Sequence, residues 1–214
     1  MHSPRSSKIN FTSHYAEGHE ISDIADWSSL HSGQDVRHQA VEWNFGTDTI
    51  WSKTSSISNN VASQLYTHKC GFNWIYHLQR ENGEQAGHSL SELISELGSH
   101  EHLTYDGAAV QVGTDTSFMN MVRQAEIYYH LLAPRRPNGN PEEGSIREVN
   151  QRFYQVMLKT RVPKRQWDFG LAWICEIGNV TVNSSRYANG RTPLEIIAGC
   201  TPDITKYLDF GFYN

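Results

Sequence analysis

The chain has 214 residues, enough for one sizeable domain, and 38% of them are hydrophobic, so it can bury a core. Charged residues make up 19%, the three cysteines are far apart with no Cys-x-x-Cys pair, and no run of eighteen apolar residues occurs. These features exclude a disordered chain, a disulfide framework and a membrane-spanning protein, and they fit a reducing intracellular compartment.

The net charge of −5 conceals one basic segment. Residues 1–134 carry a net charge of −8 and residues 166–214 carry −2, whereas residues 135–165 carry +5. A basic run in an otherwise acidic chain indicates either a solvated helix face or a surface for phosphates, and charge alone favours the solvated face.

Residues 1–44 are rich in Ser, His and Asp and show no sustained apolar period, which predicts an irregular N-terminal leader. The first residues contain no apolar segment of the kind found in signal peptides. Five histidines occur in the leader, but the cysteine pair that would complete a zinc site is missing, so surface histidines are the favoured interpretation.

Three segments with β-branched and aromatic residues in partial alternation follow, at 45–52, 61–68 and 72–79. Turn-forming sequences separate them, which predicts an antiparallel meander. The sequence ENGEQAGH, residues 81–88, indicates a loop. Ser89 to Glu92 then forms a capping box for a helix that ends at Gly98.

The rest of the chain alternates between short strands and helices. A strand, LTYD, ends at Asp106, residues 115–129 are predicted to be helical, and YHLLAP gives one more strand that Pro134 ends. Helices are predicted from Pro141 to about Arg161, at about 165–178, and from the Thr192 capping box to Gly199. This order predicts an α/β domain with a mixed sheet.

Three carboxylates stand where such a domain can bring them together. Asp48 lies inside the first strand, Asp106 ends the fourth, and Glu143 lies in the first turn of a helix. Hard oxygen ligands of this kind suit Mg²⁺ or Mn²⁺, and two such ions can promote an in-line phosphoryl displacement. If they bind no metal, Asp48 is a surface strand residue, Asp106 is a turn-forming residue, and Glu143 is a residue that interacts with the helix dipole.

The helix that contains Glu143 has two distinct faces on a helical wheel. The inward face is apolar and contains Ile146, Val149, Phe153, Val156 and Met157. About a quarter turn away lie Glu143, Arg147, Asn150 and Tyr154. Arg147 therefore either pairs with Glu143, four residues before it, or contacts a phosphate next to the site.

A wider set of polar and basic residues is predicted to contact DNA. These contacts would go to phosphates and would not depend on base sequence, because nothing in the chain resembles a base-reading motif. The set consists of Arg135, Arg136, Asn140, Arg147, Arg152, Lys159, Arg161, Lys164 and Arg165.

Residues 130–152, HLLAPRRPNGNPEEGSIREVNQR, resemble a segment of copia-type retrotransposon integrases, in which a strand and a Pro-rich loop lead into Asn-x-x-Glu and the final catalytic helix. Asn140 and Glu143 take the Asn and Glu positions, which selects Glu143 over Glu142. The segment VPKRQWD, residues 162–168, resembles the VPKRLWD-type sequence of divergent copia-like elements. Residues 189–213 resemble the region that follows the catalytic core.

The resemblance covers about residues 43–213 and implies a ribonuclease-H-like fold with a mixed five-stranded sheet flanked by helices. It implies a catalytic core at 45–162 and a C-terminal helical extension at 163–214. It further implies two divalent metal ions, 3′-end processing and strand transfer, element and target DNA as partners, a homo-oligomer, and a nuclear location for an active enzyme.

Two departures from the family pattern keep other functions open. No integrase-type zinc domain is recognisable, and Asn150 stands seven residues after Glu143, where retroviral-type integrases often have a basic residue. A truncated or decayed copy, a non-catalytic nucleic-acid-binding or interaction domain, and a metal-dependent nuclease on the same fold are therefore the alternatives.

Overall fold

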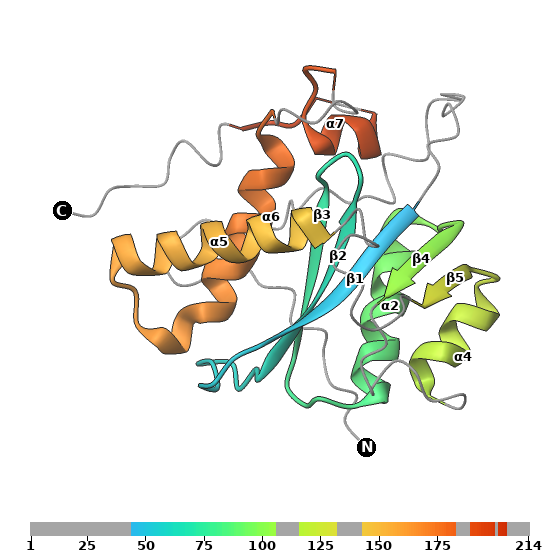
Figure 1. The fold of residues 1–214 in the computed structure, drawn as a ribbon, viewed down its shortest axis with the longest axis horizontal. Coiled ribbons are helices and arrows are strands. Elements are labelled where there is room, and N and C mark those ends of the chain that lie inside the picture. Colours follow the sequence, from blue (N-terminus) through green and yellow to red (C-terminus); the bar gives the residue numbers. More distant parts are fainter. Residues whose placement is uncertain (1–43, 106–115, 132–142, 183–188, 200, 205–214) are drawn as a thin grey trace, which may run out of the picture. The chain divides into compact units, whose positions relative to one another are not determined.

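The computed structural model describes residues 44–105, 116–131, 143–182, 189–199 and 201–204. They all lie in the second of two compact units, Val36–Asn214. Five strands form one sheet in the order β3-β2-β1-β4-β5, which places β1 at its centre (Figure 1). The strands are β1 (Asn44–Trp51), β2 (Ala62–His68), β3 (Asn73–Leu78), β4 (His102–Tyr105) and β5 (Tyr128–Leu131).

The sheet is mixed, as the sequence predicts. β1 pairs with β2 and β2 with β3 in antiparallel register, while β1 with β4 and β4 with β5 are parallel. The antiparallel half follows from short connections, and Gly71, with φ of +91°, supplies the tight turn between β2 and β3. Longer crossovers join the parallel strands, as parallel pairing requires.

Helices cover both faces of the sheet (Figure 1). None of the helices that the structure describes is both long enough and apolar enough to cross a membrane. They are α2 (Gly83–Leu97), α4 (Ser117–Gln124), α5 (Glu143–Thr160), the 3-10 turn η2 (Lys164–Gln166), α6 (Trp167–Val180) and α7 (Pro193–Ala198).

Two apolar clusters hold these layers together, because neighbouring residues of a strand point to opposite faces. Leu65 of β2 joins a cluster with residues of α5 and α6, including Ile146 and Leu171. The next residue, Tyr66, joins a second cluster with residues of α2 and α4, including Leu90 and Phe118. The predicted inward face of the Glu143 helix is confirmed, since its five apolar residues all pack in the first cluster.

The prediction for the start of α2 is wrong. Residues 81–82 precede the helix and residues 83–88 form its first turns, with the side chain of Asn82 accepting a hydrogen bond from the Gln85 backbone N–H at 2.9 Å. Ser89 lies inside the helix, where its hydroxyl donates to the Ala86 carbonyl and meets the Tyr66 hydroxyl at 2.8 Å. Tertiary contact with β2, and not a helix cap, explains this serine.

The helix predicted at 115–129 is too long. α4 ends at Gln124, Glu126 takes a left-handed conformation with φ of +54°, and Tyr128 already belongs to β5. The β-branched and aromatic run after Glu126 favours a strand that can pair with β4. The predicted strand end at Pro134 lies outside the described residues, the other boundaries agree to within about two residues, and the capping box at Thr192 with Gly199 as the helix end is confirmed.

The contact between α2 and α4 gives a test of the packing. A β-carbon at Gly87 would lie 2.5 Å from Ser117 Oγ and 2.9 Å from the Phe118 nitrogen, so the backbone would have to shift. We expect Gly87→Ala to lower the free energy of unfolding by about 1–3 kcal/mol, because overpacking outweighs the gain in helix propensity. Urea unfolding of the full chain measures this change.

Gly144→Ala is the matched control, because among the described residues nothing beyond its own chain neighbours and helix backbone lies within 4 Å of the position that its β-carbon would take. It should raise the free energy of unfolding by up to about 1 kcal/mol, since alanine favours the helix. Equal stability of Gly87→Ala and wild type would contradict the close approach of the two helices.

Candidate active site

Asp48 lies near the middle of β1, the central strand, and its side chain is half-buried. It pairs in register with Leu65, so it points to the sheet face that α5 and α6 cover. Ile50, two residues further along, packs in the same cluster. One carboxylate oxygen, Oδ1, accepts a hydrogen bond from the Thr49 backbone N–H at 2.8 Å.

The two neighbours of Asp48 are threonines that point to the other face of the sheet. The buried side chain of Gln64 lies between them, with Nε2 donating to Thr47 Oγ1 and Oε1 accepting from Thr49 Oγ1 at 2.8 Å. Thr47 Oγ1 also donates to the Leu65 carbonyl at 3.0 Å. Polar contacts therefore tie β1 to β2 directly beneath Asp48.

Asp106 itself lies outside the described residues. The strand that leads to it, β4, is parallel to β1, and its last residue, Tyr105, pairs with Thr47. Tyr105 is buried in the cluster formed with α2 and α4 and contacts the ring of Phe118. The chain thus reaches position 106 from a strand end that is fixed next to Asp48.

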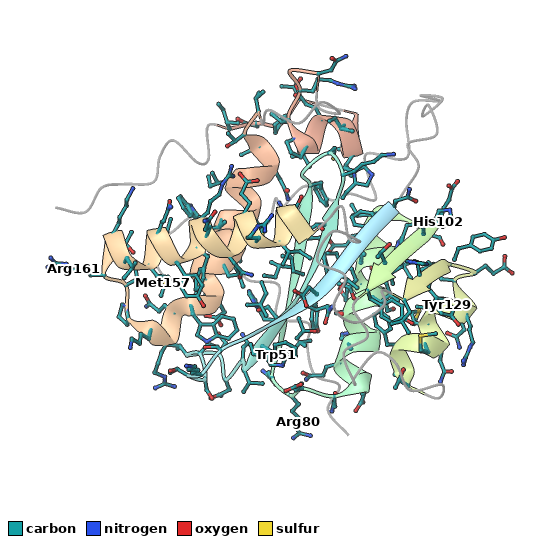
Figure 2. The ribbon with its side chains drawn as sticks, in the orientation of Figure 1. Trp51, Arg80, His102, Tyr129, Met157 and Arg161 are labelled. Atoms are coloured by element: carbon teal, nitrogen blue, oxygen red, sulfur yellow. The ribbon has the colours of Figure 1, made fainter. Side chains whose placement is uncertain are left out.

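Glu143 is the first residue of α5, and its side chain is outside the described part of the structure. One turn later, Ile146 and then Val149 are buried in the cluster that contains Leu65, the register partner of Asp48. In Figure 2, Met157 and Arg161 mark the other end of α5, away from the strands. The start of this helix is therefore held on the sheet face of Asp48.

Several of the residues predicted to contact DNA are described, and all of these are exposed. Arg152 forms an ion pair with Glu148, and Arg165 Nη2 reaches the Ser56 carbonyl at 3.4 Å. Arg147, Lys159, Arg161 and Lys164 also lie on α5 or directly after it, whereas Arg135, Arg136 and Asn140 lie outside the described residues.

Among the side chains that the structure describes, no three His, Cys, Asp or Glu gather closely enough to hold a metal ion. Of the predicted carboxylates Asp48, Asp106 and Glu143, only Asp48 belongs to these side chains. The grouping of the three stays a prediction.

The VPKRQWD segment makes structural contacts that the sequence analysis did not predict. Trp167 Nε1 donates to the Thr54 carbonyl at 2.8 Å, and the buried Asp168 accepts from Asn60 Nδ2 at 2.8 Å. The Ile57 N–H donates to the Arg165 carbonyl at 2.8 Å. The segment thus anchors the β1–β2 loop on the start of α6.

A serine and a histidine near Asp168 form a hydrogen-bonded pair, but their burial excludes a hydrolytic site. Ser63 Oγ and His77 Nδ1 lie 2.6 Å apart, and the His77 ring meets the edge of Trp167 at 6.0 Å. Ser63 has no exposed surface and His77 is 8% exposed, so no substrate reaches them. Burial lowers the pKa of His77 to about 4, although the Asp168 carboxylate opposes this shift.

No protein-family model and no curated protein matches this chain by sequence, but solved structures share its fold. The BIV integrase catalytic core has a TM-score of 0.56 and 15% identity over 79% of this chain and 99% of its own. A chain of the simian T-cell lymphotropic virus intasome structure, solved in complex with PP2A regulatory subunit B56 gamma, has a TM-score of 0.57 and 16% identity over 76% of this chain and 58% of its own. The magnesium-bound HTLV-2 integrase core in its trimeric form gives 0.55 and 12% over 73% and 96%, respectively.

These neighbours show that the chain has the ribonuclease-H-like fold of retroviral integrase catalytic cores. The predicted fold class is confirmed. At 12–16% identity the likeness concerns the fold, and it does not extend to the copia-type assignment or to the site residues.

Two buried histidines make the stability of this fold sensitive to acid. Burial lowers the pKa of His100 to about 4, as it does for His77, whereas an unfolded chain titrates near 6.5. The unfolded state therefore binds more protons between these values, so the free energy of unfolding falls as the pH drops from 6.5 towards 4. Each histidine contributes up to about 1.4 kcal/mol per pH unit.

His100→Phe tests this, because a phenyl ring can keep the edge contact with Phe45 without titrating. In urea unfolding at several pH values, its stability should fall less steeply than that of wild type over this window. The exposed His88→Gln variant controls for removal of a histidine as such. If the free energy of unfolding fell equally steeply with pH in His100→Phe and in wild type, His100 would not be a source of the acid sensitivity.

Proposed function

We propose that this chain is the catalytic domain of an integrase-type polynucleotidyl transferase that performs 3′-end processing and strand transfer. The observation that carries the proposal is that Asp48 points from the central strand to the sheet face on which the Glu143 helix packs. The ribonuclease-H-like fold, shared with integrase catalytic cores, supports it. The same fold also carries nucleases, so the reaction itself has to be measured.

The donor set fits a divalent metal. Asp48, Asp106 and Glu143 offer only carboxylate oxygens, which are the ligands that Mg²⁺ and Mn²⁺ prefer. Asp48 sits half-buried beside apolar side chains, and a bound cation would stabilise its negative charge there. When bound, two such ions would neutralise phosphate charge and lower the pKa of the attacking hydroxyl. An HTLV-2 neighbour was solved with magnesium.

The residues of the chain would bind and orient the DNA. α5 and η2 expose Arg147, Lys159 and Lys164, which suit contacts with phosphates. On the same sheet face as Asp48, His102 and Tyr128 are exposed, so the β4–β5 part of that face is open to a substrate. Arg152 is less available because it is paired with Glu148.

The copia-type assignment belongs to the same proposal and rests on the sequence segments at 130–152 and 162–168. With it come element ends and target DNA as partners, and the nucleus as the place of action of an active enzyme. HTLV-2 integrase cores are known in trimeric and dimeric forms, and we propose a homo-oligomer for this chain.

Substituting each carboxylate tests the catalytic assignment. We expect Asp48→Asn, Asp106→Asn and Glu143→Gln each to reduce strand transfer and 3′-end processing at least about 100-fold, because charge neutralisation at the phosphate is lost. The assay uses labelled duplex ends with Mn²⁺ or Mg²⁺ and the full chain. Glu142→Gln is the matched control and should keep near-wild-type activity.

The outcomes of this series separate the alternatives. Water-dependent nicking without strand transfer, lost in the same three variants, would identify a nuclease. DNA binding without chemistry under either metal would identify a non-catalytic binding domain or a decayed copy. Activity that survives Asp48→Asn would contradict the site.

DNA binding should depend on salt through the basic residues of α5 and η2. For each phosphate contact removed, the slope of log K against log salt should become shallower by about 1. We expect this for Arg147→Ala and Lys164→Ala in fluorescence anisotropy titrations with a short duplex from 50 to 200 mM salt. Arg80→Ala, an exposed residue outside the basic segment, should keep the wild-type slope. If no variant changed the slope of log K against log salt, DNA would bind at a surface other than α5 and η2.

A further inference from the structure

Gln64 is an unusual residue for the centre of a sheet. Only 1% of its surface is exposed, and both ends of its amide are used, one by each threonine that flanks Asp48. A buried amide is costly unless its hydrogen bonds are made, so the two bonds keep the amide between Thr47 and Thr49.

These contacts act on the backbone that carries Asp48. Because successive residues of a strand point to opposite faces, Thr47 and Thr49 point towards α2 and α4 while Asp48 points towards α5. A bridge across both neighbours restricts rotation of the two peptide units between them. It therefore fixes the direction in which the Asp48 side chain leaves the strand.

We propose that Gln64 is a positioning residue that holds the Asp48 carboxylate for a divalent cation. This rests on the proposed function, in which Asp48 is a metal ligand. Mg²⁺ demands near-ideal octahedral geometry, so a ligand that swings on its backbone binds it less tightly. The partners that orient metal ligands commonly matter about 10- to 100-fold for affinity.

A purely structural role is the competing explanation, since the same bonds also pin the register of β1 and β2. The two explanations predict different metal affinities for a variant that still folds. A structural role lowers the melting temperature and leaves metal affinity of the folded protein unchanged. A positioning role lowers the affinity even far below the melting temperature.

The experiment measures Mn²⁺ affinity of the full, folded chain by electron paramagnetic resonance. Gln64→Met keeps the length of the side chain and removes the amide, and it should weaken binding roughly 10-fold. Thr47→Val and Thr49→Val keep the shape and remove one bond each, so smaller losses are expected. Thr47→Ser and Thr49→Ser restore the hydroxyl and should restore the affinity. The valine variants also serve if Gln64→Met does not fold.

Thr67→Val is the matched control. Thr67, in β2, is buried like Thr47 and Thr49 of β1, but its hydroxyl has no hydrogen-bond partner among the described residues, so its replacement should leave Mn²⁺ affinity unchanged. Equal losses for Thr67→Val and Gln64→Met would overturn the proposal, because a general softening of the core would explain both. Wild-type affinity in Gln64→Met and both valine variants would also overturn it.

Asp48→Asn separates this proposal from the proposed function. If Asp48→Asn leaves Mn²⁺ affinity unchanged, Asp48 is no ligand and both fail. If Asp48→Asn weakens binding while the Gln64 and valine variants do not, only the positioning role fails. In the metal-free protein, faster hydrogen exchange of the Thr49 amide in Gln64→Met, but not in Thr67→Val, would support the bridge independently of metal.

Discussion

The central position of β1 is the constraint on which the rest of this structure depends. β1 bonds to β2 on one side and to β4 on the other, so its two faces must serve two different helix layers. The face with Phe45 is packed against α2 and α4, and the face with Ile50 meets α5 and α6. Asp48 lies on the second of these faces, where its side chain is half-buried.

The second helix layer is held at both ends of α6, and this in turn supports α5. At its start, Trp167 and Asp168 bind the β1–β2 loop. Near its other end, the Asn179 side chain accepts from the Asn73 N–H and donates to the Asn73 carbonyl, both at 2.7 Å. The edge strand β3 thus gains two hydrogen bonds from a side chain, which also leaves fewer free backbone groups for another strand. α5 therefore packs on α6, a helix that hydrogen bonds hold at both ends.

Much of this organisation could be predicted from local pattern, and the failures have a common physical cause. The strands and the Thr192 capping box follow from alternation and helix-end chemistry within a few residues. Asn82 and Ser89 are both plausible helix caps, and contacts with Tyr66 and α4 decided between them. The sequence also supplied Asp48 as a candidate but not Gln64, whose partners come from another strand and depend on register. Asp168 meets Asn60 across 108 positions, which no local signal reports.

The buried polar groups are concentrated around β1 and β2, and this placement indicates that they fix the relative positions of neighbouring segments. Gln64, His77 and Asp168 could, together with their hydrogen-bond partners, be replaced at little cost by well-packed apolar residues if only stability mattered, because buried polar pairs gain little over apolar packing. Their contacts instead fix relative positions: strand register beneath Asp48, and the β1–β2 loop against α6. Apolar packing alone tolerates small slips, whereas a hydrogen bond at 2.8 Å does not. A carboxylate that binds a cation in a strict geometry needs support from hydrogen bonds. The chain provides this support at the central strand, beneath Asp48.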